Sequence, residues 1–163
     1  MAISVGDKLP DATLIYMTDE GPGSVQLADK LAGRKVVIVA VPAAFSNTCD
    51  KLHMPSFIRT KAQFDGKGVD EIICLSVNDV FVVRAWGEST GATEAGITML
   101  ADADGSFTKA IGMAFDAAVI GFYGRSVRYA MLVEDGVAKI IQTEEKAGVC
   151  EMTSGEALLE KMA

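Results

Sequence analysis

The stretch Val36–Ile58, VVIVAVPAAFSNTCDKLHMPSFI, decides the fold class of this chain. Residues 36–41 form an unbroken apolar run of mostly β-branched side chains. Such a run favours a strand that is covered on both faces over an edge strand. Pro42 lacks a backbone N–H and therefore ends the strand. A short loop follows, and from Cys49 onward the residues are expected to form a helix, so the stretch predicts a buried strand followed by a helix.

The start of this helix decides the chemistry expected of Cys49. Ser46, Asn47 and Thr48 are residue types that cap helices, so Cys49 is expected in the first turn. Unpaired N–H groups and the positive end of the helix dipole stabilise an anion there. The anion of a cysteine is the thiolate, which is its reactive form. The alternative is a buried, inert thiol, as expected for Cys74 in the apolar run EIICLSV, but Cys49 has polar neighbours.

The remaining elements alternate along the chain. Strands are expected at residues 12–17, 36–41, 71–77, 98–100, 127–133 and 137–141. Helices are expected at residues 27–31, 49–64 with a kink or restart at Pro55, 80–88, 107–112 and 154–163. The segment TDEGPGS at residues 18–24 is expected to be a turn, and Glu134-Asp135-Gly136 joins the last two strands in a hairpin. Strands that alternate with helices before a hairpin predict an α/β layered domain.

Composition excludes several classes of protein. The length of 163 residues predicts one domain, residues 1–163, and the 50% hydrophobic content argues against disorder. The net charge of −7 argues against nucleic acid or an anionic membrane as the main partner. No apolar stretch approaches the roughly 20 residues of a membrane span. The three cysteines without a C-x-x-C motif and the absence of a secretory signal predict a reducing, cytoplasmic location, with a processed organellar form as the alternative.

Pro42, Ser46 and Cys49 share a motif spacing, Pro-x-x-x-Thr/Ser-x-x-Cys, that is found in the peroxiredoxins. The longer run VPAAFSNTCDKLHMPSF resembles the peroxiredoxin 5 (type II) branch, whose pattern is close to VPGAFTPxCSxxHLPGF. Further similar stretches are VGDKLPDATL, LSVNDVFVVRAWG and RYAMLVEDGVAK, which extend the resemblance over nearly the whole chain. The resemblance implies a thioredoxin-like fold, in which helices flank a central mixed β-sheet on both faces.

The same resemblance implies a thiol-dependent peroxidase that reduces hydrogen peroxide and small alkyl hydroperoxides. Its catalytic residues would be Cys49, Arg128, Ser46 and Pro42, with a sulfenic acid formed at Cys49 and recycled by glutaredoxin with glutathione or by thioredoxin. No metal, haem or flavin is implied, and a homodimer is expected. Two alternatives stay open: a non-enzymatic peroxide sensor, and a thiol–disulfide exchange protein of the same fold, although the missing C-x-x-C motif argues against the latter.

Arg128 is the second residue expected to carry chemistry. On its predicted strand it shares a face with Ala130 and Leu132, whereas Arg125 has the opposite parity and is expected to be a supporting or surface charge. A buried guanidinium is costly unless it is paired. One of the 22 acidic residues could supply the partner. The resemblance instead assigns Arg128 to the active-site thiolate and the bound peroxide.

His53 and Cys150 leave more than one interpretation open. His53 follows Cys49 by four residues, so a Cys–His pair or a two-ligand metal site is conceivable, but a histidine packed near the pocket rim fits best. Cys150 lies in the polar loop AGVCEMTS, the region where some members of the branch carry a resolving cysteine, although its register is displaced. We predict catalysis by a single cysteine, with Cys150 dispensable and Cys74 inert.

Overall fold

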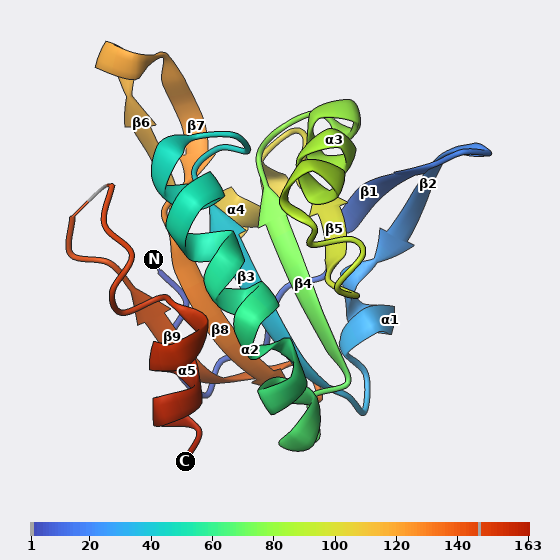
Figure 1. Ribbon diagram of the computed structural model, residues 1–163, viewed down its shortest axis with the longest axis vertical. Helices are drawn as coiled ribbons and strands as arrows, with labels where there is room; N and C mark the ends of the chain where they lie inside the picture. Colours follow the sequence, from blue (N-terminus) through green and yellow to red (C-terminus); the bar gives the residue numbers. More distant parts are fainter. Residues whose placement is uncertain (1, 147) are drawn as a thin grey trace.

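A seven-stranded mixed sheet forms the centre of the computed structural model, which describes residues 2–146 and 148–163 (Figure 1). The strand order is β2-β1-β5-β4-β3-β8-β9. The strands are β1 (Thr13–Thr18), β2 (Gly21–Gln26), β3 (Lys35–Val41), β4 (Glu71–Ser76), β5 (Thr98–Ala101), β8 (Tyr129–Glu134) and β9 (Val137–Thr143). β3 runs parallel to β4 and antiparallel to β8, which makes the sheet mixed.

β3 lies inside the sheet because its side chains are buried on both faces. Residues 36–41 are all at most 1% exposed, which confirms the expectation of a doubly covered strand. Val37, Val39 and Val41 enter the hydrophobic cluster on one face, whereas the alternate residues of the strand enter the cluster on the other. The two clusters together form the core of the protein.

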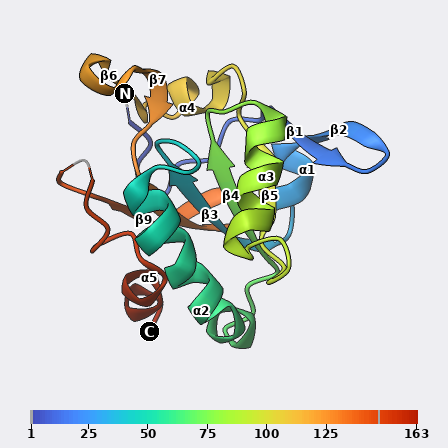
Figure 2. The ribbon, with the colours of Figure 1, turned by 45° about the horizontal axis from the view of Figure 1, so that its top comes forward.

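Helices cover both faces of the sheet (Figures 1 and 2). One face carries the π-helical turn η1 (Cys49–His53), α2 (Met54–Gly66), α3 (Val80–Thr90) and α5 (Gly155–Lys161). The other face carries the short helices α1 (Leu27–Leu31) and α4 (Ser106–Ala110). This arrangement confirms the predicted mixed sheet with helices on both faces. No helix within residues 2–146 and 148–163 has both the length and the apolar character needed to span a bilayer.

Several predicted boundaries are confirmed by their end residues. Asp79 caps α3 by accepting from the N–H groups of Phe81 and Val82, and Ser154 caps α5 by accepting from Ala157. The helix that carries Cys49 restarts before Pro55, because η1 ends at His53 and α2 begins at Met54. Pro55 then lies in the first turn of α2, where its missing N–H leaves no bond unmade.

The turn between β8 and β9 also follows the prediction. Asp135 and Gly136 have φ angles of +48° and +78°, the left-handed conformation that a tight hairpin loop requires. Asp135 tolerates this region better than most residues that carry a Cβ atom. The hairpin is therefore set by local sequence.

Two predictions about strands are wrong. The segment TDEGPGS was expected to be a turn, but β2 begins within it at Gly21 and tolerates Pro22 because β2 lies at the edge of the sheet. The strand predicted at residues 127–133 begins at Tyr129, so Arg128 immediately precedes β8. Arg128 still faces the side of the sheet that carries Cys49, as its parity predicted.

A two-stranded hairpin beyond the main sheet has no counterpart among the predicted elements. It consists of β6 (Ala114–Ala117), the 3-10 turn η2 (Ala118–Ile120) and β7 (Phe122–Ser126). Its strands are short and mostly only partly buried, so the sequence shows no buried apolar run there. The hairpin projects from the end of the main sheet next to α4 and forms a wall beside the Cys49 loop (Figure 2).

Candidate active site

Cys49 lies in the first helical turn after β3, as predicted. Helical backbone begins at Asn47, and the N–H of Asp50 donates to the Ser46 carbonyl at 2.8 Å. The Cys49 side chain is 0% exposed. The predicted side-chain caps do not form on this turn: Thr48 instead donates its hydroxyl to the Gly148 carbonyl at 2.7 Å. Thr48 thus serves to connect this turn to Gly148 and not to cap the helix.

The loop before Cys49 is held in an unusual conformation. Phe45 has a φ of +66°, in the left-handed region that costs a residue with a Cβ atom roughly 1 to 2 kcal/mol. Next to it, the N–H of Ala44 donates to Oδ1 of Asn78 at 3.0 Å. The side chain of Asn78 therefore anchors this loop.

Two donors converge on the sulfur of Cys49. The Ser46 hydroxyl lies 2.9 Å from Cys49 Sγ and 2.8 Å from the Ala43 carbonyl oxygen. Nη2 of Arg128 lies 3.2 Å from the same sulfur. A hydroxyl carries one proton, so Ser46 donates either to the Ala43 carbonyl or to the sulfur. A thiolate attracts that proton, and together with Arg128 it gains two hydrogen bonds, one of them from a cation.

Arg128 is buried, at 6% exposure, and its second partner is a histidine. Nη1 of Arg128 lies 3.0 Å from Nδ1 of His53. None of the ion pairs between described residues includes Arg128, so the carboxylate partner considered as an alternative is not found there. The guanidinium is therefore held by one sulfur and one imidazole nitrogen.

His53 lies in the interior and not at the pocket rim, so that prediction is wrong. The side chain is 0% exposed, and Nε2 lies 2.9 Å from the carbonyl oxygen of Thr153. Burial, followed by the charge of Arg128, lowers the pKa of His53 from 6.5 to about 3. Because Arg128 and Thr153 occupy both ring nitrogens, His53 forms neither a Cys–His pair nor a metal site. Among the described residues, no group of three or more potential ligands is placed to hold a metal.

A cavity of about 350 Å³ opens beside the two groups that contact the sulfur. Ser46 and Arg128 line it, and so do Pro42 and Gly148. The hairpin β6–β7 supplies apolar side chains on the remaining side, namely Phe115, Ala117, Ile120 and Phe122. An adjoining cavity of about 240 Å³ shares Pro42 and Arg128 and extends toward Glu144. The cavity beside Ser46 and Arg128 is thus polar at one end and apolar at the other.

The aromatic wall is the part of the site that sequence reasoning missed. Phe115 and Phe122 meet edge to face with ring centroids 6.4 Å apart, and the guanidinium of Arg125 lies 5.4 Å from the Phe122 centroid. Arg125 was predicted to be a supporting or surface charge, and it supports this wall. A pair of phenylalanines on either side of a glycine-containing turn was the available signal, but it is a weak one.

The two other cysteines differ in exposure. Cys74 lies on β4 and is 1% exposed, and burial raises the pKa of its thiol far above the ordinary value. Its predicted position in a buried strand is confirmed. Cys150 is partly exposed, its sulfur lies 3.8 Å from Oγ1 of Thr153, and burial raises the pKa of its thiol. All three cysteines are free thiols in this structure.

Comparison with known proteins identifies the family to which this site belongs. The sequence profile named Redoxin matches residues 4–158. Over 165 residues the chain is 45% identical to Peroxiredoxin-2E-2, chloroplastic, of Oryza sativa subsp. japonica, an alignment that covers 98% of this chain and 72% of the rice protein. The chain belongs to the peroxiredoxin family, in its type II branch.

Solved peroxiredoxin structures match the fold over nearly the whole chain. The crystal structure of reduced Prx3 from Vibrio vulnificus in complex with hydrogen peroxide is 43% identical, with a TM-score of 0.90 and 99% coverage of both chains. The crystal structure of peroxiredoxin 5 from Alvinella pompejana is 32% identical, with a TM-score of 0.85 and coverage of 98% of this chain and 97% of that one. The thioredoxin-like fold is thereby confirmed, and this peroxiredoxin is a thiol peroxidase.

Proposed function

We propose that this peroxiredoxin reduces hydrogen peroxide and small alkyl hydroperoxides at Cys49. The observation that carries the proposal is the convergence of Ser46 Oγ and Arg128 Nη2 on the buried Cys49 sulfur, at 2.9 Å and 3.2 Å. Both donors also line the cavity. A peroxide bound there would contact the same two donors that hold the Cys49 sulfur, and these donors would orient its O–O bond for nucleophilic attack.

The chemical step conserves atoms and electrons within the sulfur and the peroxide. The Cys49 thiolate attacks the nearer peroxide oxygen, an S–O bond forms and the O–O bond breaks. Sulfur is oxidised by two electrons, the proton of the attacked oxygen passes to the leaving oxygen, and this oxygen departs as water or an alcohol. The sulfenate left on Cys49 then takes a proton from water to give the sulfenic acid. Arg128 and Ser46 donate hydrogen bonds to the charge as it moves from sulfur to the leaving oxygen. Pro42, at the cavity edge, shields the thiolate from water.

The size and lining of the cavity support small alkyl hydroperoxides as substrates beside hydrogen peroxide. A volume of about 350 Å³ greatly exceeds the roughly 30 Å³ that one water molecule occupies in the liquid. The apolar wall of Phe115, Ile120 and Phe122 would contact an alkyl group. The polar end would hold the two peroxide oxygens.

Recycling by an external thiol completes the proposed cycle. The sulfenic acid condenses with one thiol to give a mixed disulfide and water, and a second thiol then releases the Cys49 thiol. We propose glutaredoxin with glutathione, or thioredoxin, as the source of these thiols. Burial raises the pKa of both other thiols, Cys74 fully and Cys150 partly buried, so both are poor nucleophiles at neutral pH. This supports an external thiol as the reductant.

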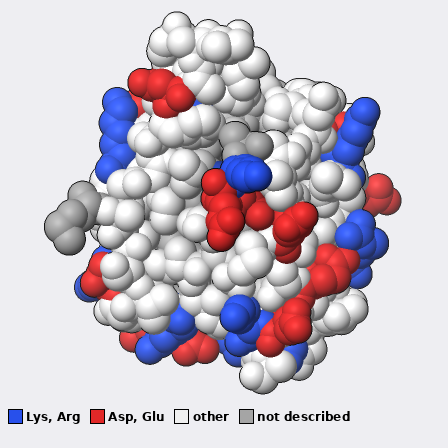
Figure 3. Space-filling view, turned by 90° about the vertical axis from the view of Figure 1, so that its left-hand side faces the viewer, with Lys and Arg blue, Asp and Glu red and all other residues white. Residues whose placement is uncertain are grey.

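We also propose a homodimer in a reducing, cytoplasmic environment. Large apolar side chains are exposed on the β6–β7 hairpin and in the loop before Cys49, namely Val119 at 100%, Ile120 at 64%, Tyr123 at 67% and Phe45 at 51%. In the space-filling view, the top of the molecule, formed by the β6–β7 hairpin, is largely uncharged, whereas acidic side chains gather below it (Figure 3). Sedimentation velocity tests the dimer: wild type should sediment as a dimer, and a Val119→Glu, Ile120→Glu variant should sediment as a monomer.

Peroxide consumption with a coupled reductant tests the proposed function. Wild-type protein should turn over many equivalents of hydrogen peroxide with glutaredoxin and glutathione or with thioredoxin, and Cys49→Ser should consume none beyond the background, because a hydroxyl stays protonated at neutral pH. A single oxidation without turnover under either reducing system would favour the peroxide sensor. Unchanged consumption by Cys49→Ser would overturn the assignment of Cys49.

A further inference from the structure

His53 lies between the active-site arginine and the loop that carries Cys150. Its Nδ1 is 3.0 Å from Nη1 of Arg128, and its Nε2 is 2.9 Å from the carbonyl oxygen of Thr153. The other end of the guanidinium is 3.2 Å from the Cys49 sulfur. One continuous chain of hydrogen bonds therefore runs from Cys49 through Arg128 and His53 to Thr153.

The chemistry of the two partners fixes the protonation of the ring. A guanidinium only donates, so Nδ1 of His53 must accept, and a carbonyl only accepts, so Nε2 must carry the proton. An imidazolium could not accept from Arg128 and would place a second cation beside it. Burial, followed by the charge of Arg128, lowers the pKa of His53 to about 3, which agrees with a neutral ring.

A neutral acceptor suits this position better than a carboxylate. A buried carboxylate would neutralise the guanidinium and compete with the thiolate for its charge. The imidazole satisfies the inner N–H of Arg128 and adds no negative charge, so the full positive charge stays directed at Cys49. Rigid support of the guanidinium matters, because a small misplacement of a charged donor costs much of its effect on the reacting atoms.

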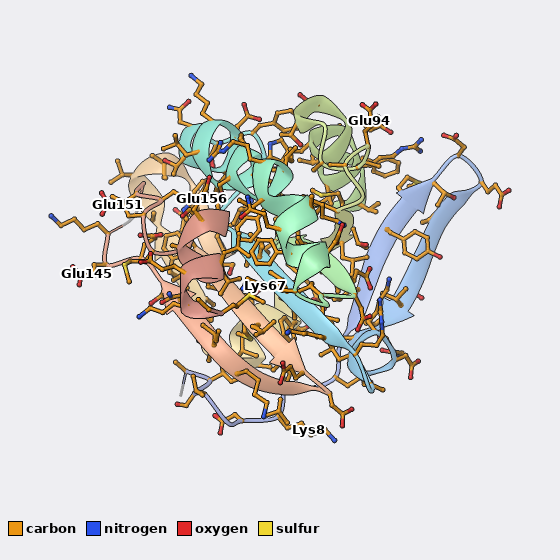
Figure 4. All side chains as sticks on the ribbon, turned by 60° about the horizontal axis from the view of Figure 1, so that its bottom comes forward. Lys8, Lys67, Glu94, Glu145, Glu151 and Glu156 are labelled. Carbon is orange, nitrogen blue, oxygen red and sulfur yellow. The ribbon has the colours of Figure 1, made fainter. Side chains whose placement is uncertain are left out.

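The loop at the far end of this chain is itself tightly held. The carboxylate of Glu144 accepts from the N–H groups of Glu151 and Thr153 at 3.1 Å and 2.7 Å, and also from the Thr153 hydroxyl. The loop contacts Cys49's own helical turn through Gly148, whose carbonyl accepts from Thr48. Glu145 and Glu151 are exposed and point away from the body of the protein (Figure 4). The position of Thr153 is thus set by the loop as a unit.

We propose that neutral His53 is a positioning residue that holds Arg128 against Cys49 and couples this arginine to the loop of residues 148–153. The proposal rests on the peroxidase function proposed above. The charged and titratable groups that face His53 are Arg128 directly, Cys49 through Arg128, and Glu144 and Cys150 through Thr153. From α2, the uncharged ring of Phe57 packs against it in a T-shaped arrangement, at 5.6 Å between centroids.

Two substitutions separate the two halves of this role. In His53→Asn, the side-chain oxygen can take the place of Nδ1 and accept from Arg128, but the bond to Thr153 is lost. In His53→Gln, the side-chain NH₂ can take the place of Nε2 and donate to Thr153, but Arg128 loses its acceptor. Each variant is the matched control for the other, because both replace the ring by a neutral amide.

The variants are compared by stopped-flow oxidation of Cys49, by alkylation of Cys49 with iodoacetamide, and by alkylation of Cys150 followed by peptide mapping. We expect His53→Asn to keep peroxide oxidation within about threefold of wild type while Cys150 is alkylated faster, since the arginine stays held but the loop is released. We expect His53→Gln to slow oxidation of Cys49 by about 10- to 100-fold with little change at Cys150. The proposal would be overturned if Cys49 were oxidised at the same rate in both variants, or if both variants lost rate only in proportion to their loss of thermal stability.

The alkylation of Cys49 needs no peroxide, so it separates this proposal from the proposed function. If wild type failed to consume peroxide but His53→Gln still slowed Cys49 alkylation relative to His53→Asn, the peroxidase function would fall and the positioning role would stand. A measurement on wild type covers the case in which a variant does not fold. His53 is the single histidine of the sequence, so its ¹⁵N resonances are unambiguous. A neutral ring with the proton on Nε2 at pH 7 supports the proposal, and an imidazolium or the Nδ1–H tautomer overturns it.

Discussion

Nη2 of Arg128 lies 3.2 Å from the sulfur of Cys49, although 79 positions separate the two residues in the sequence. The pairing of β3 with β8 creates this contact, because Tyr129 at the start of β8 pairs with Ala40 near the end of β3. Arg128 therefore reaches the sheet edge at which the chain leaves β3 for the Cys49 loop. A change in this register would remove the contact, since a shift of one residue turns each side chain to the opposite face.

Replacing Arg128 tests the value of that contact. Arg128→Ala should slow the oxidation of Cys49 by peroxide on the order of 10²-fold, because the charge that supports the thiolate and the leaving oxygen is lost. Arg128→Lys should recover part of the rate, since an ammonium supplies charge but cannot bond to the sulfur and to His53 in the same fork. Stopped-flow kinetics of the oxidation step measure both. A folded Arg128→Ala protein with wild-type kinetics would leave Arg128 a structural role only.

The aromatic wall should govern the choice between peroxides. Phe122→Ala removes a ring that lines the cavity and packs on Phe115. We expect kcat/KM for tert-butyl hydroperoxide to fall about 10-fold while the value for hydrogen peroxide changes less than about twofold, because one apolar contact contributes on the order of 1 to 3 kcal/mol. Tyr123→Ala, on the same strand but outside the cavity lining, is the control. Equal losses for the two peroxides would indicate a general disturbance of the hairpin.

Cys150 should be dispensable for turnover. Its thiol is partly buried and raised in pKa, and the Glu144 contacts hold its loop in place, so it is expected to react slowly with a sulfenic acid on Cys49. After one equivalent of peroxide, thiol counting and mass spectrometry should show one thiol lost in both wild type and Cys150→Ser. The loss of two thiols in wild type alone, with no turnover of Cys150→Ser on thioredoxin, would make Cys150 the resolving residue.

His53 should make folding stability depend on pH in a defined window. The pKa of His53 is about 3 in the folded protein, and its ordinary value of 6.5 applies to the unfolded chain. Between pH 3 and pH 6.5 the unfolded chain therefore binds a proton at His53 that the folded protein does not bind. Stability from the neutral ring is therefore fully present above pH 6.5 and is lost as the pH falls toward 3, at up to about 1.4 kcal/mol per unit. Urea unfolding of wild type between pH 7 and pH 5 should show this slope.

The matched control for this pH effect is His53→Asn, which has no group that titrates there. The difference in unfolding free energy between wild type and this variant should shrink as the pH falls, because Asp and Glu residues contribute equally to both proteins. A constant difference from pH 7 to pH 5 would show that His53 is not kept neutral by the fold.

The buried strand, the loop and the helix that carries Cys49 were predictable from the sequence, because each depends on local properties. A run of β-branched residues at 36–41 favours a covered strand, Pro42 ends it, and Pro55 restarts the helix whichever segments pack nearby. The hairpin of β8 and β9 is equally local, since two positive φ angles at Asp135 and Gly136 define it. Motif spacing within this local frame was enough to indicate the family.

Tertiary structure decided how the distant groups meet. The partners of His53 lie 75 and 100 positions away, and no pattern of hydrophobic residues encodes which nitrogen accepts or donates. The wall of Phe115 and Phe122 depends on a hairpin whose short, partly exposed strands contain no run of buried apolar residues. Local sequence sets backbone conformation through sterics and capping, whereas strand register and packing in three dimensions determine which buried donors and acceptors become neighbours. The sequence therefore determined the position of Cys49 in its strand–loop–helix unit, and the packing of the sheet decided what surrounds its sulfur.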